Sequence, residues 1–422
     1  MCRPRRHQAR WCLALFTLAA ALGLPGAPAI ASSLPNTTSG IHLGLAFGYP
    51  RDWAPPARAD YIWGGGTPSS ATYIEGYFPF DVDWVVARRG YHDFGWWRRH
   101  HPDWIVYRCN RRTPAYYGDS PQVPLDMSNP NVRRYQLAKA LSLLSQGYSG
   151  VDIDNFTLTN YQSRCGAYRH GVWKPLHYQQ NGFGGYGDAQ LIKDMIAWLR
   201  FVSDRVHGAY PGATVTVNSS VMLDGGVEFA RRLEPYVDGV FDEGSFTQSG
   251  AGRLTDEGWQ TEVAWAEELA RNNKAFVLNE LLDDSGDSAV TSSQLNWALA
   301  NYLLVKGEHT YTYVYGNVYR YGTYYDRPAY HVPIGHPISA RYERGMVQFR
   351  DYSGGETVVN PSSTTTYEVQ LPGAYTDTSG GLVLGSIILP PASGVVLLRT
   401  GGPQGASTVK SQAIVRQTEE RK

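Results

Sequence analysis

Short apolar segments alternate with longer segments of helical periodicity, from about residue 41 to about residue 320. This alternation is typical of parallel strands joined by crossover helices, and it predicts an α/β fold. Eight strands in such a series predict closure into a (β/α)8 TIM barrel. The predicted strands are 59–63, 73–78, 104–109, 150–154, 213–218, 237–242, 275–280 and 309–315.

Helix boundaries can be assigned between several of these strands. Asn129 can cap a helix that ends at Gly147, and Asp188 can cap the next one. Two further helices are predicted at 255–272 and 292–306, where apolar residues again recur at helical spacing. Each predicted helix lies between two predicted strands, as the barrel requires.

The pattern changes after Pro337. Residues 345–400 contain short strand-like runs separated by Gly, Pro, Ser and Asn, with no helical period. We therefore predict a barrel over 32–338 and a small C-terminal antiparallel β-sandwich domain over 339–400. Residues 401–422 are polar and without periodicity, which predicts a disordered tail.

The N-terminus has the pattern of a signal peptide. An Arg-rich start is followed by the apolar run Trp11–Leu24 and by Ala29-Ile30-Ala31, which matches a cleavage site. We predict a signal peptide over 1–31 and a secreted or periplasmic protein. No later stretch is long and apolar enough to predict a membrane span.

Composition narrows the expected partners. Lys and Arg total 38, as do Asp and Glu, so the formal net charge is zero and no nucleic-acid partner is predicted. Aromatic residues reach 13%, with 29 Tyr and 12 Trp. Tyr and Trp offer flat apolar rings with a polar tip, which suit the faces of sugars, although most of them are expected to fill the core.

Only Cys109 and Cys165 remain once the signal peptide is removed. In an oxidising compartment two thiols usually pair, so we predict a disulfide, with two separate buried thiols as the alternative. The segment 155–187 has no periodicity but is rich in aromatic residues, including Trp173. We predict that it is a lid, held by the disulfide, in which Trp173 contacts substrate.

Two predicted strands end in carboxylates, at Asp154 and at Glu243. Side chains alternate along a strand, so Asp152 and Asp154 share one face. Strand ends converge at the mouth of a barrel, and two opposed carboxyls are what glycoside hydrolysis requires. Further strand-end residues are predicted to bind substrate together with Asp152 and Trp173, namely Asn218, Glu280 and Tyr315.

Six short motifs of this chain match a known family, namely Val123–Val132, Gly147–Asn155, Val237–Gly244, Ile334–Pro337, Val358–Ser362 and Leu389–Val396. They resemble those of the glycosyl-hydrolase-like family 15 group, whose TIM barrels are related to polygalactosaminidase and α-amylase-like hydrolases. The resemblance covers most of residues 60–400.

The resemblance implies that Asp154 is the nucleophile and that Glu243 is the proton donor. The chain departs from the family pattern at two positions. Ser149 stands where relatives commonly carry Asp, and Asp152 stands where an apolar residue is usual. The second departure leaves open which of the two aspartates attacks.

We therefore expect an exported glycoside hydrolase that cleaves a polysaccharide or oligosaccharide with two carboxylates and without a cofactor or metal. One alternative is a barrel that binds glycan without cleaving it. Another is a metal-dependent barrel hydrolase, because Asp152 and Asp154 could hold Ca²⁺ or Mg²⁺. The oligomeric state cannot be predicted from this sequence.

Overall fold

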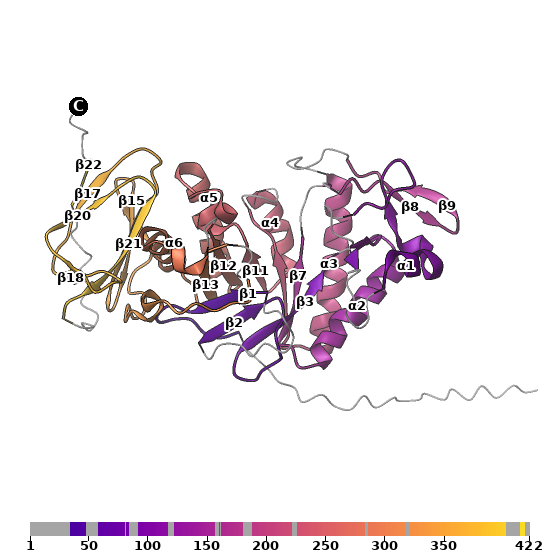
Figure 1. Cartoon of the computed structure of the whole chain (residues 1–422), viewed down its shortest axis with the longest axis horizontal. Coiled ribbons are helices and arrows are strands. Elements are labelled where there is room, and N and C mark those ends of the chain that lie inside the picture. The colour runs from indigo at the N-terminus through magenta and orange to yellow at the C-terminus, as the bar shows by residue number, and fades with distance from the viewer. Residues whose placement is uncertain are drawn as a thin grey trace, which may run out of the picture.

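A computed structural model describes most of the chain (Figure 1). The predicted signal peptide, 1–31, lies outside the described residues. The described residues are 34–47, 58–80, 82–83, 92–116, 122–156, 160, 162–179, 188–221, 226–282, 286–317, 321–401 and 414–417.

Eight parallel strands form a closed barrel, in the order β1-β13-β12-β11-β10-β7-β3-β2. The prediction of a (β/α)8 barrel is confirmed. Inside the barrel, aromatic rings pack face to face, as Trp63 does on Phe241 at 4.2 Å between ring centroids. The strands are β1 (Leu43–Ala46), β2 (Ala59–Trp63), β3 (Tyr73–Pro79), β7 (Gly150–Asp154), β10 (Thr214–Asn218), β11 (Gly239–Asp242), β12 (Ala275–Leu281) and β13 (Thr310–Tyr315).

One predicted barrel strand is wrong, and one strand was missed. In the predicted segment 104–109 only Val106–Tyr107 is a strand, β5, and it pairs antiparallel with a strand outside the barrel. The missing place is taken by β1, which has four residues and is buried throughout. A short strand that is buried on both sides has no alternation to reveal it. Because β1 takes the place of the wrongly predicted strand, β7 and β11 are still the fourth and sixth barrel strands along the chain, as predicted.

The predicted helices are present between the strands. Asn129 and Asp188 cap their helices through side-chain hydrogen bonds to Asn131 N and Leu191 N, as expected. Besides α1, which is described below, the α-helices are α2 (Pro130–Ser145), α3 (Ala189–Ala209), α4 (Val227–Leu233), α5 (Asp256–Arg271) and α6 (Ser292–Val305). Short 3-10 segments are η1 (Pro102–Trp104), η2 (Glu234–Tyr236), η3 (Ser245–Gly250), η4 (Asp287–Ala289) and η6 (Pro328–His331).

Antiparallel sheets form the C-terminal part, as predicted, and they pack on α6 (Figure 1). Tyr352 and Thr357 donate hydrogen bonds to carbonyl groups of α6. One sheet contains β14 (Tyr342–Arg344), β15 (Val347–Tyr352), β16 (Gly355–Asn360), β21 (Ser393–Arg399), β18 (Tyr375–Thr376) and β19 (Leu382–Val383). The other contains β20 (Ser386–Leu389), β17 (Tyr367–Gln370) and β22 (Val415–Gln417).

The strand β22 corrects part of the predicted disordered tail over 401–422. Val415 pairs with Val369 and Gln417 pairs with Tyr367, so this segment is an edge strand on β17. A segment of three residues is too short for its alternation to stand out from a polar sequence. The pairing of its backbone with β17 is what orders it.

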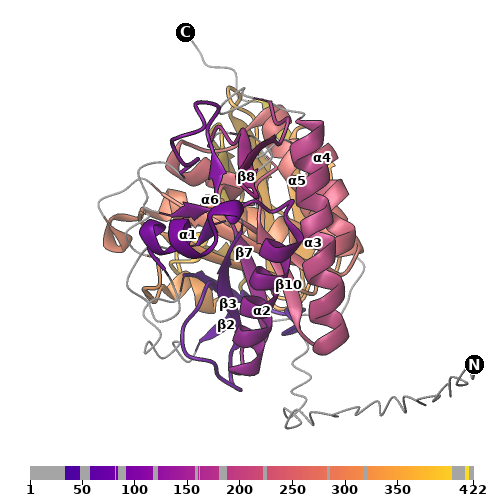
Figure 2. The ribbon, with the colours of Figure 1, turned by 90° about the vertical axis from the view of Figure 1, so that its right-hand side faces the viewer.

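Two insertions build a small subdomain beside the barrel. The first follows β3 and the second follows β7, and the predicted disulfide between Cys109 and Cys165 joins them. This insert subdomain lies at the opposite end of the molecule from the C-terminal sheets, and Figure 2 views the molecule from that end. It contains β4 (Val82–Asp83), α1 (Phe94–His100), β5 (Val106–Tyr107), β6 (Val123–Pro124), β8 (Gly166–Arg169) and β9 (Val172–Pro175).

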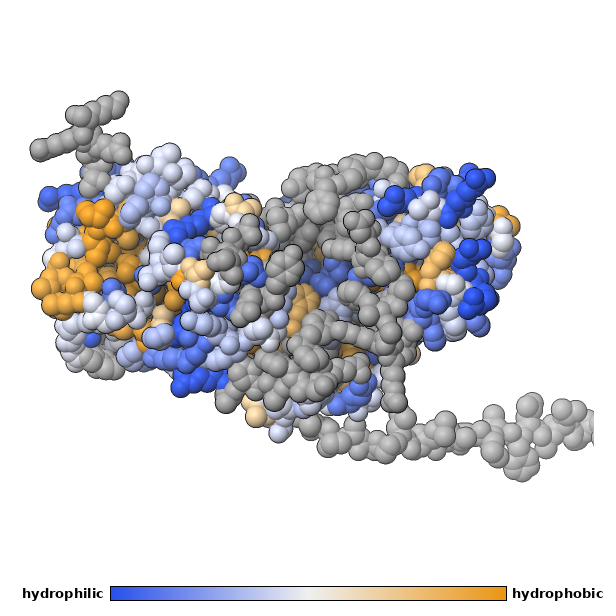
Figure 3. All heavy atoms as spheres, viewed as in Figure 1, coloured by the Kyte–Doolittle hydropathy of each residue, from blue (hydrophilic) through white to orange (hydrophobic). Residues whose placement is uncertain are grey.

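Apolar side chains also gather on one exposed surface, on the C-terminal sheets (Figure 3). The most exposed large apolar residues there are Leu382, Leu384, Ile388 and Ile414.

Among the described helices, none is both long and apolar enough to cross a membrane.

Candidate active site

The two predicted catalytic carboxylates meet at the carboxyl ends of neighbouring strands. Asp154 is the last residue of β7, Asn218 is the last residue of β10, and Glu243 directly follows β11. In the parallel register Thr216 pairs with Asp152, and Asn218 pairs with Phe241. Alternation along the strands therefore points Asp152, Asp154 and Asn218 into the barrel.

The amide of Asn218 connects the two carboxylates. Its Nδ2 donates to Asp154 Oδ1 and to Glu243 Oε2, each at 3.0 Å. Because both oxygens bind one nitrogen, they lie at most about 6 Å apart, and about 5 Å apart when the two N–H bonds diverge by about 120°. This amide limits the distance between one oxygen of each acid.

Asp154 accepts an unusually full set of hydrogen bonds. Tyr77 donates to Oδ2 at 2.6 Å, and Asn155 donates its backbone N to Oδ1 at 2.8 Å and its Nδ2 to Oδ2 at 3.1 Å. Asn155 adopts φ 61°, a left-handed conformation that Asn tolerates well. Burial raises the pKa of Asp154, while the hydrogen bonds from Tyr77 and Asn218 oppose that rise.

Glu243 has a different environment. Tyr321 donates to Oε1 at 2.7 Å, and Asn279 in turn donates to the Tyr321 hydroxyl at 3.1 Å. Burial raises the pKa of Glu243, and the negative charge of Asp154 raises it further. The hydrogen bonds from Tyr321 and Asn218 act in the opposite direction. Glu243 nevertheless keeps part of its surface exposed, whereas Asp154 is 8% exposed.

A half-buried aromatic ring lies beside both acids. The ring of Phe47 lies 5.0 Å from that of Tyr321 and 6.0 Å from that of Tyr77, measured between centroids. It also contacts Trp63 edge-on at 5.1 Å. Phe47 therefore packs against the two tyrosines that donate to Glu243 and to Asp154.

Two more carboxyls are buried below the mouth. Asp152 is fully buried, and neither of its oxygens has a side-chain hydrogen-bond partner among the described residues. Burial raises its pKa well above the usual range, and the charges of Glu75 and Asp154 add to the rise. Glu75 accepts hydrogen bonds from the hydroxyls of Thr214 and Thr216, and burial raises its pKa to about 7. Both groups are therefore favoured in the neutral form at mildly acidic pH.

Gly150 leaves the space that the Thr214 hydroxyl and the Glu75 carboxyl occupy. A Cβ at this position would lie 2.1 Å from Thr214 Oγ1 and 2.9 Å from Glu75 Oε1. The glycine that opens the β7 motif is thus required by packing inside the barrel.

Glu280 and Trp173 lie away from this site, whereas Tyr315 packs edge-on against Tyr321 at 5.1 Å between ring centroids. Glu280 points to the outer face of β12, where Phe246 N lies 3.4 Å from its Oε1, and burial raises its pKa to about 8. Tyr315 is fully buried, and its hydroxyl accepts a hydrogen bond from Ala46 N at 2.8 Å. Trp173 lies on β9 in the insert subdomain, where its ring packs against Tyr168.

Three residues of the site were missed from the sequence. Tyr77 lies on β3 two residues before the strand end, and Asn279 lies two residues before the end of β12. Both face inward by alternation, so their strands carried a usable signal. Tyr321 follows β13 in a loop, and nothing in the sequence pattern pointed to it.

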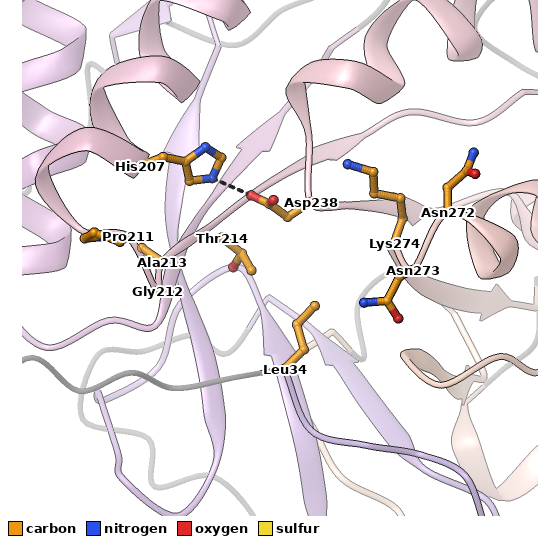
Figure 4. Close-up of a pocket in the computed structure, with 10 residues that line it drawn as sticks. All are labelled: Leu34, His207, Pro211, Gly212, Ala213, Thr214, Asp238, Asn272, Asn273 and Lys274. Carbon is orange, nitrogen blue, oxygen red and sulfur yellow. Dashed lines mark hydrogen bonds and ion pairs between the residues drawn. The ribbon is translucent and has the colours of Figure 1, made fainter.

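A cavity of about 470 Å³ lies at the other end of the barrel (Figure 4). It is lined at the amino ends of the strands, where His207 and Asp238 form an ion pair at 2.8 Å beside Thr214 and Lys274. Catalytic groups of such barrels lie at the carboxyl ends, so this cavity is separate from the candidate active site. Within the described ranges, no group of three His, Cys, Asp or Glu side chains is arranged to hold a metal ion.

A closed (β/α)8 barrel with two carboxylates opposed at its mouth defines the class of barrel glycoside hydrolases. The model of the family described as hypothetical glycosyl hydrolase family 15 matches residues 71–356. The chain belongs to this family, and it is a glycoside hydrolase. No curated protein matches the sequence significantly.

Several solved structures are similar in part. A family GH13_31 enzyme has 15% identity and a TM-score of 0.46, over 78% of this chain and 83% of that one. The glycoside hydrolase domain of PelA from Pseudomonas aeruginosa has 13% identity and a TM-score of 0.38, over 65% and 94%. Aspergillus fumigatus Ega3, in complex with galactosamine, has 13% identity and a TM-score of 0.40, over 67% and 93%. These TM-scores are low, and the family assignment depends on the family model alone.

The raised pKa of Glu75 predicts how stability varies with pH. In the unfolded chain Glu75 loses its proton near pH 4.5, whereas in the folded protein it keeps the proton up to about pH 7. The folded state therefore binds more protons in this window, and stability falls as the pH rises through it. Between pH 4.5 and pH 8 the proton loss from Glu75 should lower the unfolding free energy of the wild type by an amount on the order of 2–3 kcal/mol. Glu75→Gln should abolish this decrease.

Urea unfolding at pH 4.5 and at pH 8 measures this difference. Glu228→Gln is the control, since the Glu228 side chain is 94% exposed and should leave the pH dependence unchanged. An unfolding free energy that falls equally in Glu75→Gln and in the wild type would contradict the prediction.

Proposed function

We propose that the protein is an exported glycoside hydrolase that cleaves a polysaccharide with Asp154 as nucleophile and Glu243 as general acid and base. The observation that carries this proposal is the Asn218 amide, which holds one oxygen of each acid at 3.0 Å. A separation near 5 Å between the two carboxyls is typical of retaining enzymes, whereas inverting enzymes need about 6.5 Å or more. The bridge therefore supports a mechanism that retains the anomeric configuration.

In the first step Glu243 donates its proton to the glycosidic oxygen as that bond breaks. Asp154 Oδ2 or Oδ1 forms a bond to the anomeric carbon, and the leaving sugar departs with a new hydroxyl group. In the second step Glu243 accepts a proton from water, whose oxygen attacks the anomeric carbon and releases Asp154. Each carboxyl ends the cycle in the protonation state in which it began.

The different surroundings of the two acids support this division of roles. Asp154 receives four hydrogen bonds, which favour its charged form, whereas Glu243 receives two. Two nearby acids resist double ionisation, so Glu243 keeps the proton while Asp154 is charged. Once Asp154 is esterified its charge is gone, the pKa of Glu243 falls, and Glu243 can act as the base.

The position of Asp152 argues against it as nucleophile. It is fully buried, and no described side chain donates a hydrogen bond to its oxygens. A carboxyl in such a setting favours the neutral form, which is a poor nucleophile. Asp154, one step nearer to the mouth on the same face of β7, is the better candidate.

Export rests on two features of the chain. Residues 1–31 have the pattern of a signal peptide. The bridge between Cys109 and Cys165 suits an oxidising compartment, since structural disulfides are rare in the cytosol. We infer a secreted or periplasmic location, where a polysaccharide substrate is accessible.

Neutralising either acid should abolish hydrolysis. Asp154→Asn and Glu243→Gln should each lower kcat/KM by about a thousandfold or more, measured as reducing ends released from a panel of polysaccharides. Glu280→Gln is the matched control, because Glu280 faces away from the site and is already largely neutral at pH 7. It should retain near-normal activity.

Near-normal turnover in either site variant would contradict the proposed roles. A wild-type protein that binds glycans but releases no reducing ends would support the non-catalytic barrel instead. Inactivation by a chelator would support the metal-dependent alternative.

The two tyrosines should control opposite limbs of the pH profile. Tyr77→Phe removes a donor from Asp154 and raises its pKa, so the acidic limb of kcat/KM should move upward by about one pH unit. Tyr321→Phe removes a donor from Glu243 and raises its pKa, so the basic limb should move upward by a similar amount.

Tyr342→Phe is the control, because the Tyr342 hydroxyl donates to Asp351 in the C-terminal sheets. It should leave both limbs in place. If Tyr77→Phe moved the basic limb, or Tyr321→Phe the acidic one, the roles of the two acids would have to be exchanged.

A further inference from the structure

The insert subdomain is far more basic than the chain as a whole. The complete sequence balances 38 Lys and Arg with 38 Asp and Glu. Within its described residues, 82–83, 92–116, 122–129 and 162–179, in contrast, there are eight Lys and Arg and four Asp. The positive charge is therefore concentrated on one part of a neutral protein, and it needs an explanation other than overall solubility.

Four of these cations are exposed, and they lie on two segments that the contact between Arg111 and Trp173 brings together. Arg108, Arg111 and Arg112 lie in the turn after β5, and Lys174 lies on β9. None of the four forms an ion pair with another described residue, unlike Arg169, which binds Asp126 at 2.6 Å. Exposed cations that have no counterion among the described residues favour an anionic partner.

The turn that carries the three arginines is held in place from several sides. Asn110 Oδ1 accepts hydrogen bonds from Arg112 N at 3.0 Å and from Thr113 N at 2.9 Å. The disulfide from Cys109 ties the same turn to the second insertion. A surface that is already ordered loses little conformational entropy when it binds a partner.

Aromatic rings support the cations. The guanidinium carbon of Arg111 lies 5.4 Å from the centroid of the Trp173 ring, and the Tyr168 hydroxyl donates to Arg111 O at 3.2 Å. Both rings are half-buried. Planar guanidinium groups bind carboxylates bidentately, and aromatic rings pack on the apolar faces of sugars. Cations and aromatic rings together match a sugar chain that bears carboxylates.

The position of this surface connects it to the active site. The insertions leave the carboxyl ends of β3 and β7, and Pro79 at the end of β3 pairs with Asp154. Both insertions therefore start at the mouth of the barrel. Figure 3 shows hydrophilic atoms gathered at the end of the molecule where β8 and β9 lie in Figure 1.

We propose that Arg108, Arg111, Arg112 and Lys174 bind the carboxylates of an acidic glycan and so select a polysaccharide rich in uronic acids. The binding surface stands on its own observations, whereas the statement that this glycan is the substrate rests on the proposed function. A long acidic chain held here can continue across the barrel mouth to Asp154 and Glu243.

Affinity electrophoresis tests the surface, with polygalacturonate in the gel and neutral dextran as the reference. The protein carries Glu243→Gln, so that binding is measured without cleavage. Addition of Arg111→Gln, Arg112→Gln and Lys174→Gln should weaken binding to polygalacturonate by about tenfold, because each exposed charge contributes a modest, salt-screened amount. Binding to dextran should not change.

A matched control removes two Arg and one Lys elsewhere, with Lys193→Gln, Arg232→Gln and Arg271→Gln on exposed positions of α3, α4 and α5. This control should bind polygalacturonate as the parent does. Equal retardation of all three proteins would overturn the proposal. So would equally strong, variant-sensitive binding to duplex DNA or to phosphatidylglycerol vesicles, since that would mark a general polyanion surface.

Cleavage is measured separately, as reducing ends released from uronic-acid polysaccharides by the protein with Glu243 intact. Variant-sensitive binding without any release would uphold the surface and overturn the proposed function. Release that is unaffected by the triple substitution would uphold hydrolysis and overturn the role of the surface in selecting the substrate.

Discussion

The hydrogen bonds of one amide set the geometry of this site. Asn218 can reach both Asp154 and Glu243 only because β7, β10 and β11 are neighbours in parallel register. A shift of one residue in β10 would turn Asn218 to the outside of the barrel. The closed barrel is therefore more than a scaffold, since its register determines the distance between the two acids.

The interior of the barrel is polar as well as aromatic. Asp152 and Glu75 occupy inward positions below Asp154, where most barrels place branched apolar residues. Neutral carboxyls are tolerated there at mildly acidic pH, because burial raises the pKa of both groups. The stacked rings of Trp63 and Phe241 fill the remaining space. Stability and the electrostatics of the site thus depend on the same buried groups.

Sequence periodicity was sufficient for the barrel, the helix caps and the pair Asp154 and Glu243, because these depend on local alternation and on strand ends. It was insufficient wherever a residue acts through tertiary contacts. Tyr321 reaches Glu243 from a loop, and β1 is too short and too buried to show alternation. Glu280 ends a strand as an active-site acid would, but the register directs it outward. Only the assembled barrel distinguishes such residues.

The most direct test of the account is the anomeric configuration of the sugar first released, followed by ¹H NMR during hydrolysis of a cleaved polysaccharide. The Asn218 bridge holds one oxygen of each acid within about 6 Å of the other. This favours direct attack by Asp154, so the account predicts retention of configuration. Inversion would show that a water molecule attacks the anomeric carbon in place of Asp154, and would contradict the assignment of Asp154 as nucleophile.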